Sequence, residues 1–318
     1  MHKNNQIKSR KKQHLKIAAS DSSQYKKLTT GFENYRFIHC ALPEMDFNKV
    51  NITTQFLDYD IACPLVINPI SGGENNGKRL NRALAKVAAA EKIALSLGSI
   101  RAALEDRKSL QSFKVVNDYS GEIPLIVNIG CLQTKSPNNR RAILKVCDAL
   151  DADAISVHLN PLQEIIQPEG GKDFRGVLRA IGNLQKVSER PIIIKEVGFG
   201  LSRSVVKKLI DTGIKWFDVS GGGGTSWSRI EAQRVKNPEG REVAKEFFEW
   251  GIPTAKCLRD IEELDDIKII ASGGIRSGQD FAKSLALGAN LAGIAGSVVQ
   301  VWSQFGQQEV EKLIKKYK

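Results

Sequence analysis

The sequence predicts an α/β protein whose main domain is a closed (β/α)8 TIM barrel. Three observations support this fold: short apolar runs, helical segments between them, and polar residues where the runs end. Eight apolar runs follow one another from residue 64 onward, at a spacing of roughly thirty residues that is typical of strand–helix repeats. Eight such repeats favour a closed parallel barrel, and a doubly wound open sheet is the alternative.

The apolar runs are too short for helices, and most are rich in Ile and Val, as strands buried on both faces are. They cover residues 64–71, 93–99, 124–130, 154–160, 191–197, 216–221, 267–274 and 291–296. The segments between them have helical periodicity. Leu80, Leu84 and Val87, for example, fall on one apolar stripe, and Gly288 is placed to end a helix that starts near Gly278.

The chain divides into an N-terminal extension, residues 1–63, and a barrel, residues 64–318, with a long insertion at 225–252 after the sixth strand. A hydrophobic content of 42% allows a large core, and no run approaches the ~20 apolar residues of a membrane span. The N-terminus lacks the apolar segment of a secretory signal, although its basic composition leaves a transit peptide as an alternative. We expect a cytoplasmic protein with no membrane partner.

Cysteine and charge content narrow the function classes. The five cysteines are dispersed without a C-x-x-C pair, which indicates reduced structural thiols and no zinc site. The net charge of +12 favours an anionic partner: nucleic acid, a membrane surface or a phosphorylated metabolite. The basic run at residues 10–14, RKKQH, is by itself a weak signal, because such runs are usually solvated.

Polar residues gather at the predicted strand ends, where TIM barrels place their functional groups. Polar side chains in apolar core strands are costly unless they are paired or used. Five consecutive strands end in such residues or in glycines, which predicts an active site at this end of the barrel. The polar side chains are those of Asn128, His158, Asn160, Lys195 and Glu196.

Glycines after strands seven and eight predict a phosphate site. The segments ASGGIRSG (271–278) and LGANLAGIAG (287–296) let backbone N–H groups and helix N-termini approach a phosphate. Arg276 supplements them with charge. Two tight turns without a ligand are the alternative.

Three further segments carry candidate chemistry. Flavin-binding barrels commonly place a lysine near the electron-rich edge of the flavin, which is one interpretation of Lys195. An ion pair with a neighbouring strand and a Schiff base are the alternatives. In HLNPLQE (158–164), Glu164 offers a hard oxygen ligand for Mg²⁺ held mainly by substrate phosphates. The glycine run at 221–224 predicts a loop that approaches a ligand closely. Thr225 can donate to the ligand, and Glu231 either covers the site or is an exposed helix residue.

Taken together and in this order, the motifs resemble those of the type 2 isopentenyl diphosphate isomerase family, from Arg10 to about Ala295. The resemblance implies that the substrate is bound by Arg10, Lys11, His14, Arg101, His158 and Asn160 at its diphosphate and by Gln163 at the reacting hydrocarbon. It implies FMN contacts at Ile70, Ser71, Gly72, Ser99, Asn128, Lys195, Thr225, Gly274, Ile275, Arg276, Ala295 and Gly296. It also implies that Gln163 and Glu231 are catalytic and that Glu164 binds the metal. Ile70 and Ile100 depart from the family pattern, which has Met and Gln there. The apolar change at Ile70 should preserve flavin packing, whereas Ile100 removes a polar contact, so substrate affinity is the property most affected.

The resemblance further implies the reaction. Isopentenyl diphosphate and dimethylallyl diphosphate interconvert by a 1,3-proton shift, with reduced FMN as acid and base, NAD(P)H as reductant and Mg²⁺ on the diphosphate. It implies a homo-oligomer, a tetramer or octamer, with no nucleic-acid partner. The alternative on the same fold is an FMN-dependent oxidoreductase of the 2-hydroxy-acid oxidase type. A nucleic-acid-binding protein would explain the charge but would leave the strand-end residues without a role.

Overall fold

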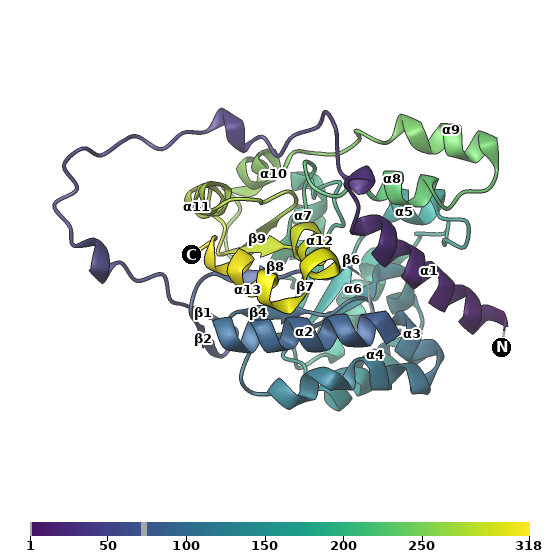
Figure 1. The fold of residues 1–318 in the computed structure, drawn as a ribbon. Coiled ribbons are helices and arrows are strands. Elements are labelled where there is room, and N and C mark those ends of the chain that lie inside the picture. The colour runs from purple at the N-terminus through teal and green to yellow at the C-terminus, as the bar shows by residue number, and fades with distance from the viewer. Residues whose placement is uncertain (1, 71–74) are drawn as a thin grey trace.

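The computed structural model describes residues 2–70 and 75–318 and confirms the predicted barrel (Figure 1). All eight predicted strands form, and each pairs in parallel with its neighbours until the last pairs with the first. The strands are β3 (Leu65–Ile67), β4 (Ala94–Ser96), β5 (Leu125–Gly130), β6 (Ala154–His158), β7 (Ile192–Lys195), β8 (Trp216–Asp218), β9 (Lys268–Ser272) and β10 (Leu291–Ile294).

Each strand is shorter than the apolar run that predicted it, because the last residues of most runs leave the ladder and turn toward the cavity described below. Asn160, for example, precedes helix α5 and lies outside the ladder. The run at 64–71 extends into residues 71–74, which lie outside the described part of the chain.

Helices surround the strands, as Figure 1 shows. They are α2 (Asn75–Glu91), α3 (Arg101–Glu105), α4 (Pro137–Leu150), α5 (Pro161–Ile166), α6 (Val177–Val187), α7 (Arg203–Ile210), α10 (Thr254–Ile261), α11 (Gly278–Ala286), α12 (Gly296–Phe305) and α13 (Gln307–Lys315). Short 3-10 helices cover Arg107–Ser112, Lys114–Tyr119 and Cys131–Lys135. Local sequence sets several ends: Ser277 caps α11 by accepting from the Asp280 N–H. Gly288 follows α11 at φ +91°, which confirms its predicted place after the helix.

Two apolar regions hold the barrel. The larger one packs the outer faces of the strands against the helices, and the smaller one fills the N-terminal end of the barrel. A hairpin of β1 (Thr54–Phe56) and β2 (Tyr59–Ile61) closes this end, with Phe56 edge-on to Trp216 at 5.0 Å between ring centroids. The opposite end therefore remains as the place for a cavity.

The predicted insertion after the sixth strand contains α8 (Trp227–Ala232) and α9 (Pro238–Glu246). The N-terminal extension contains α1 (His2–Ala18) and 3-10 helices at Asp21–Ser23, Phe32–Asn34 and Phe47–Lys49. In Figure 1, α1 lies against the barrel, whereas the chain that follows runs out in a wide excursion before it returns at β1. We call residues 36–53 the arm. Its apolar side chains are exposed: Phe37, Ile38, Leu42, Met45, Phe47, Val50 and Ile52.

The structure bears on the cysteines and on membrane-spanning helices. Four of the five cysteines are buried, but Cys40 lies exposed in the arm, so the interpretation of all five as structural is wrong for Cys40. Through the described ranges, no helix combines the length and apolarity needed to cross a membrane.

Candidate active site

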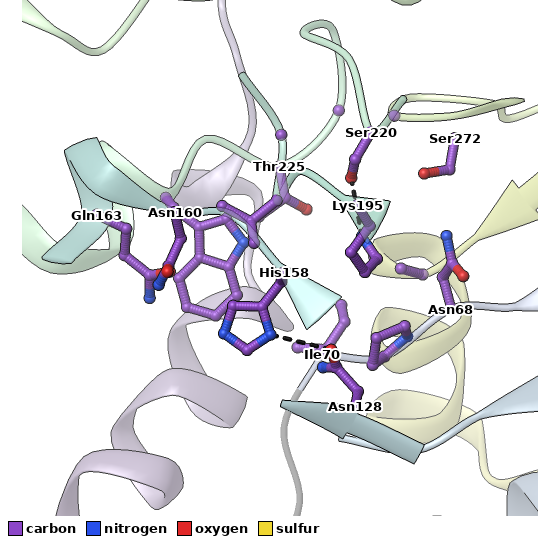
Figure 2. Close-up of a pocket in the computed structure, with 18 of the residues that line it drawn as sticks. Asn68, Ile70, Asn128, His158, Asn160, Gln163, Lys195, Ser220, Thr225 and Ser272 are labelled. Atoms are coloured by element: carbon purple, nitrogen blue, oxygen red, sulfur yellow. Dashed lines mark hydrogen bonds between the residues drawn. The ribbon is translucent and has the colours of Figure 1, made fainter. Parts of the chain in front are cut away.

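A cavity opens at the carboxyl ends of the barrel strands, with about 1270 Å³ of space including the part open to solvent. Figure 2 shows polar side chains from many strands converging on it. Most of the residues singled out from the sequence line it: Arg10, Lys11, His14, Ile70, Ser99, Arg101, Asn128, His158, Asn160, Gln163, Glu164, Lys195, Thr225, Gly274, Ile275, Arg276, Ala295 and Gly296. Ser71 and Gly72 lie outside the described residues. Glu231 is fully buried behind the wall, so the alternative of an exposed helix residue is wrong.

One face of α1 forms part of the cavity wall. Arg10, Lys11 and His14 are buried although α1 is polar as a whole. The Lys11 ammonium donates to the Ser99 carbonyl at 3.0 Å and lies 5.6 Å from the Phe113 ring centroid. The interpretation of RKKQH as a solvated run is therefore wrong for these three residues.

The basic residues of this wall are crowded. Burial lowers the pKa of Arg10, and the charge of Arg101 lowers it further. Two guanidinium groups and one ammonium group therefore face one region of the cavity. Glu105 pairs with Arg101 at 3.0 Å, and the charges of Glu169 and Glu231 partly oppose the shift at Arg10. The wall still concentrates positive charge, so this region is suited to an anion.

Glu231 connects α1 to the insertion and to α5. Its Oε1 lies 2.9 Å from His14 Nε2, although the ring N–H is not aligned for a hydrogen bond. Gln163 Nε2 donates to the same oxygen at 3.0 Å, and Arg234 pairs with Oε2 at 2.5 Å. Burial alone would raise the pKa of Glu231, but His14, Arg234 and Gln163 lower it below its ordinary value. Glu231 is thus held as a carboxylate directly behind Gln163.

His158 is neutral in this structure. Burial lowers its pKa to about 3, and the charges of Lys195 and Arg101 contribute. Its Nδ1 lies 2.9 Å from Asn128 Oδ1, as the dashed line in Figure 2 marks. Because an amide oxygen only accepts, Nδ1 carries the proton and Nε2 is left as an acceptor. An anion bound beside the ring would favour its protonation.

Asn160, Gln163 and Glu164 form a polar cluster where α5 begins. Asn160 Nδ2 donates to Gln163 Oε1 at 3.0 Å and approaches Glu164 Oε1 at 3.5 Å. The Gly171 N–H fixes Glu164 Oε2 at 2.7 Å. Asn160 Oδ1 is buried and has no hydrogen-bond partner among the described residues, which leaves an oxygen for a ligand beside a carboxylate.

The position of Glu164 is compatible with the predicted Mg²⁺ site, in which this residue supplies one oxygen ligand. Over the described ranges, no group of three or more His, Cys, Asp and Glu side chains could hold a metal ion. A single carboxylate, such as that of Glu164, is sufficient only where substrate phosphates and water supply most of the metal ligands.

The cavity floor is built around Lys195 and Asp218 from adjacent strands. Lys195 Nζ lies 3.4 Å from Asp218 Oδ2 and 3.3 Å from Ser220 Oγ. The ion pair with a neighbouring strand, named above as an alternative for Lys195, is therefore present, while Lys195 still lines the cavity. Asn68 and Ser272 also contact Asp218. These three partners of Lys195 and Asp218 were not predicted: Asn68, Ser220 and Ser272.

Glu196 follows Lys195 at the end of β7 and accepts hydrogen bonds from the backbone. Its Oε2 accepts N–H bonds from Val197, Gly198, Phe199 and Gly200. Burial raises its pKa to about 7, while these N–H groups oppose the shift. The carboxyl group shapes the loop after β7 and is not in the cavity wall.

Glycines form the corner between β9, β10 and the loop after β8. Gly274 has φ +78°, and a Cβ there would meet Thr30 Cγ2 at 2.5 Å. A Cβ on Gly223 would meet the Thr30 nitrogen at 2.3 Å, and one on Gly224 the Gly274 nitrogen at 2.5 Å. The glycine run therefore makes a close approach, as predicted, but in the structure its close neighbours are the N-terminal extension and the loop after β9.

The same corner is suited to a phosphate. Gly274, Gly296 and Ser297 line the cavity here, and the ten-residue helix α12 begins at Gly296. Its N-terminal N–H groups attract an anion. Arg276 is held nearby by the Gly223 carbonyl at 2.8 Å and by Gln24 Oε1 at 2.7 Å. Gln24, from the N-terminal extension, had no signal in the sequence.

Comparison with known proteins first defines a class. A family model described as FMN-dependent dehydrogenase matches residues 169–318. A solved structure of a flavocytochrome b2 variant with sulfite bound is 17% identical, with a TM-score of 0.68, and covers 96% of this chain and 76% of that chain. At this identity the likeness shows the fold. The chain is thus a closed (β/α)8 barrel whose C-terminal part matches the model of the FMN-dependent dehydrogenases.

Closer relatives then define the family. A protein from Pseudescherichia vulneris named isopentenyl-diphosphate delta-isomerase is 41% identical over 298 residues, which is 93% of this chain and 86% of the relative. A protein of the same name from Nostoc sp. is 38% identical over 312 residues, 97% of this chain and 89% of the relative. The chain belongs to the isopentenyl-diphosphate delta-isomerase family.

Proposed function

We propose that the protein interconverts isopentenyl diphosphate and dimethylallyl diphosphate, with bound FMN and with Mg²⁺ on the diphosphate. The observation that carries the proposal is the buried basic wall. Arg10 and Lys11 of α1 face the same cavity as Arg101, which also pairs with Glu105 at 3.0 Å. A wall with this concentration of positive charge is suited to a strongly anionic ligand. The names of the relatives support the choice of diphosphate.

The cavity fits FMN in two places. The glycine corner with the N-terminus of α12 accepts a phosphate, and the floor presents Lys195, Ser220, Asn68 and Ser272 to a ring system with several polar edge atoms. We propose FMN and not FAD. Acid extraction followed by chromatography tests this, and a stoichiometric FAD peak would contradict it.

The remaining residues are proposed to serve the substrate. Arg10, Lys11 and Arg101 neutralise the diphosphate, and His158 Nε2 gains a proton as the anion binds beside it. Glu164 supplies one oxygen to Mg²⁺, which is otherwise held by phosphate and water. Trp227, packed edge-on to His14 at 5.2 Å, and the apolar body of Ile70 exclude water around the hydrocarbon part.

Proton transfer is the step that needs the cofactor. Bound FMN, after reduction by NAD(P)H, would supply the acid and base for the 1,3-proton shift. Gln163 is proposed to contact the reacting hydrocarbon, and the Glu231 carboxylate behind it fixes the direction of its amide through a 3.0 Å bond. The carboxylate also favours positive charge developing nearby.

The decisive experiment separates an isomerase from a 2-hydroxy-acid oxidase on the same fold. The holoenzyme is reduced once with dithionite under anaerobic conditions, freed of excess reductant and mixed with isopentenyl diphosphate in D2O. We expect many products per flavin, with solvent deuterium in dimethylallyl diphosphate. One product or fewer per flavin, with flavin reoxidised in step, would refute the proposal.

We also propose that the protein is a homo-oligomer in which the arm contacts a second copy. Seven apolar side chains of the arm are exposed, with Ile38 at 96%. The arm carries two basic and two acidic residues, Arg36, Lys49, Glu44 and Asp46, so its net charge is zero on a chain of +12. Two copies of this basic chain therefore repel each other less at the arm than over the rest of the surface. Exposed apolar surface of this kind is typical of interfaces.

Sedimentation tests the oligomer. We expect wild type to sediment as a tetramer or octamer and Ile38→Asp with Phe47→Asp to shift toward the monomer. Val243 is an exposed apolar residue of α9, and Val243→Asp is the matched control, which should not change the sedimentation. A monomeric wild type would contradict the proposal.

A further inference from the structure

Asp218 is a buried charge that lies behind the cavity wall and is not in it. It ends β8 and is 1% exposed. Three side chains that do line the cavity contact its carboxylate. Lys195 Nζ lies 3.4 Å from Oδ2, Asn68 Nδ2 donates to Oδ2 at 2.8 Å, and Ser272 Oγ donates to Oδ1 at 2.5 Å. The Ser220 N–H adds a fourth contact at 3.2 Å.

We infer that Asp218 is a positioning residue that fixes the donor pattern and the net charge of the cavity floor, and thereby the relative affinity of the site for reduced and oxidised FMN. This inference rests on the proposed function, because FMN is the ligand that it concerns. Asp218 acts through Lys195, Asn68 and Ser272, since it does not line the cavity itself.

The donor pattern follows from the hydrogen bonds. The Ser272 hydroxyl proton is committed to Asp218, so Ser272 Oγ presents only acceptor lone pairs to the cavity. Lys195 Nζ donates to the Glu196 carbonyl at 2.5 Å and to Ser220 Oγ at 3.3 Å, beside the Asp218 contact. Its three donor directions are therefore largely set by the protein, which holds the ammonium group in one place before a ligand arrives.

The charges of the floor set the sign of the effect. Lys195 and Asp218 together are close to neutral, so the floor presents less positive potential than Lys195 alone would. Reduction makes a flavin more electron-rich, and a buried carboxylate nearby opposes this because charges interact strongly away from water. Removing the Asp218 charge while keeping its shape should therefore favour reduced FMN.

The test is the midpoint potential of the FMN holoenzyme for wild type and Asp218→Asn. We expect the ratio of affinities for reduced and oxidised FMN to rise at least tenfold in the variant, which for a two-electron couple is an upward shift of about 30 mV. The dissociation constant of oxidised FMN, measured in parallel, shows whether binding as such has changed. A residue that only packs the floor would alter both redox states equally and leave the midpoint in place.

Asp153→Asn is the matched control. Asp153 precedes β6 at the opposite end of the barrel, where it accepts from the Leu125 N–H at 2.7 Å and the Tyr59 hydroxyl at 3.0 Å. The Asp153→Asn substitution removes the same charge far from the cavity, so its midpoint potential should equal that of wild type.

Ser272→Ala keeps the inference testable if Asp218→Asn does not fold. Loss of the hydroxyl donor leaves the carboxylate less compensated, so the midpoint should fall below wild type. An unchanged midpoint in Asp218→Asn, or an unchanged or raised midpoint in Ser272→Ala, would overturn the inference. A wild type that binds no FMN would instead refute the proposed function.

Discussion

Glu231 is the residue where loss of one charge should damage stability and turnover together. In Glu231→Gln, Arg234 loses its charged partner at 2.5 Å, and the new amide places its NH2 group either against Gln163 and His14 or against Arg234. Removing one partner of a buried charge pair typically costs 3–5 kcal/mol. Glutamine keeps one oxygen acceptor and Arg234 keeps Glu169 at 2.7 Å, so we expect about 2–4 kcal/mol.

The assay is thermal unfolding of the holoenzyme together with steady-state kinetics. At roughly 2 °C per kcal/mol for a chain of this size, Tm should fall by about 4–8 °C. The value of kcat should fall about 100-fold, because the amide of Gln163 is no longer held in one direction. Glu169→Gln is the control: it contacts the same arginine at a side chain that is 36% exposed, so it should cost less than about 1 kcal/mol. Equal Tm values for the two variants would refute the reasoning.

Three other predictions follow from the site. Glu164→Gln should weaken Mg²⁺ activation and leave FMN bound, because it removes one charged oxygen and keeps the shape; unchanged activation in a Mg²⁺ titration would contradict the metal assignment. Arg10→Ala should weaken binding of the diphosphate by about 1.5–3 kcal/mol, which is measured as a raised KM. Lys12→Ala, on the exposed face of α1, should have the KM of wild type. His158 has a folded pKa lowered to about 3 from 6.5, so the unfolded state binds the proton first and stability is lost as pH falls from about 6.5 toward 3. In His158→Gln, the free energy of unfolding measured by denaturant titration should depend less on pH over this range.

The barrel could be predicted from sequence because its signal repeats. Strands buried on both faces are largely apolar, so each one appeared as a short apolar run, most of them rich in Ile and Val, and the eight runs supported one another. Strand ends were less predictable, since residues such as Asn160 continue the run in sequence but leave the ladder in space. A strand ends where its ladder hydrogen bonds stop, and this point has no sequence signature.

Site residues were predictable where a polar side chain interrupts an apolar run, as at Asn128, His158 and Lys195. By the same criterion Asp218, inside WFDVSG, and Asn68, inside LVINP, were detectable. Gln24 was not, because a glutamine in a polar segment looks like any solvated residue. Its role depends on Arg276, which lies 252 positions away in the chain, and only the fold brings the two together.

The N-terminal extension is the part of the site that a barrel pattern cannot reveal. The Tyr25 N–H donates to the Gly224 carbonyl at 3.0 Å, and the Ser226 N–H donates to the Ser23 carbonyl at 2.8 Å. These bonds fix the segment that follows α1 against the loop after β8. Because α1 carries Arg10 and His14 and the next turn carries Gln24, one short stretch of chain contacts both the basic wall and the glycine corner. Loss of this docking would therefore remove the substrate-side charges and the partner of Arg276 at the same time. The strand–helix repeats of the barrel supply neither of these groups.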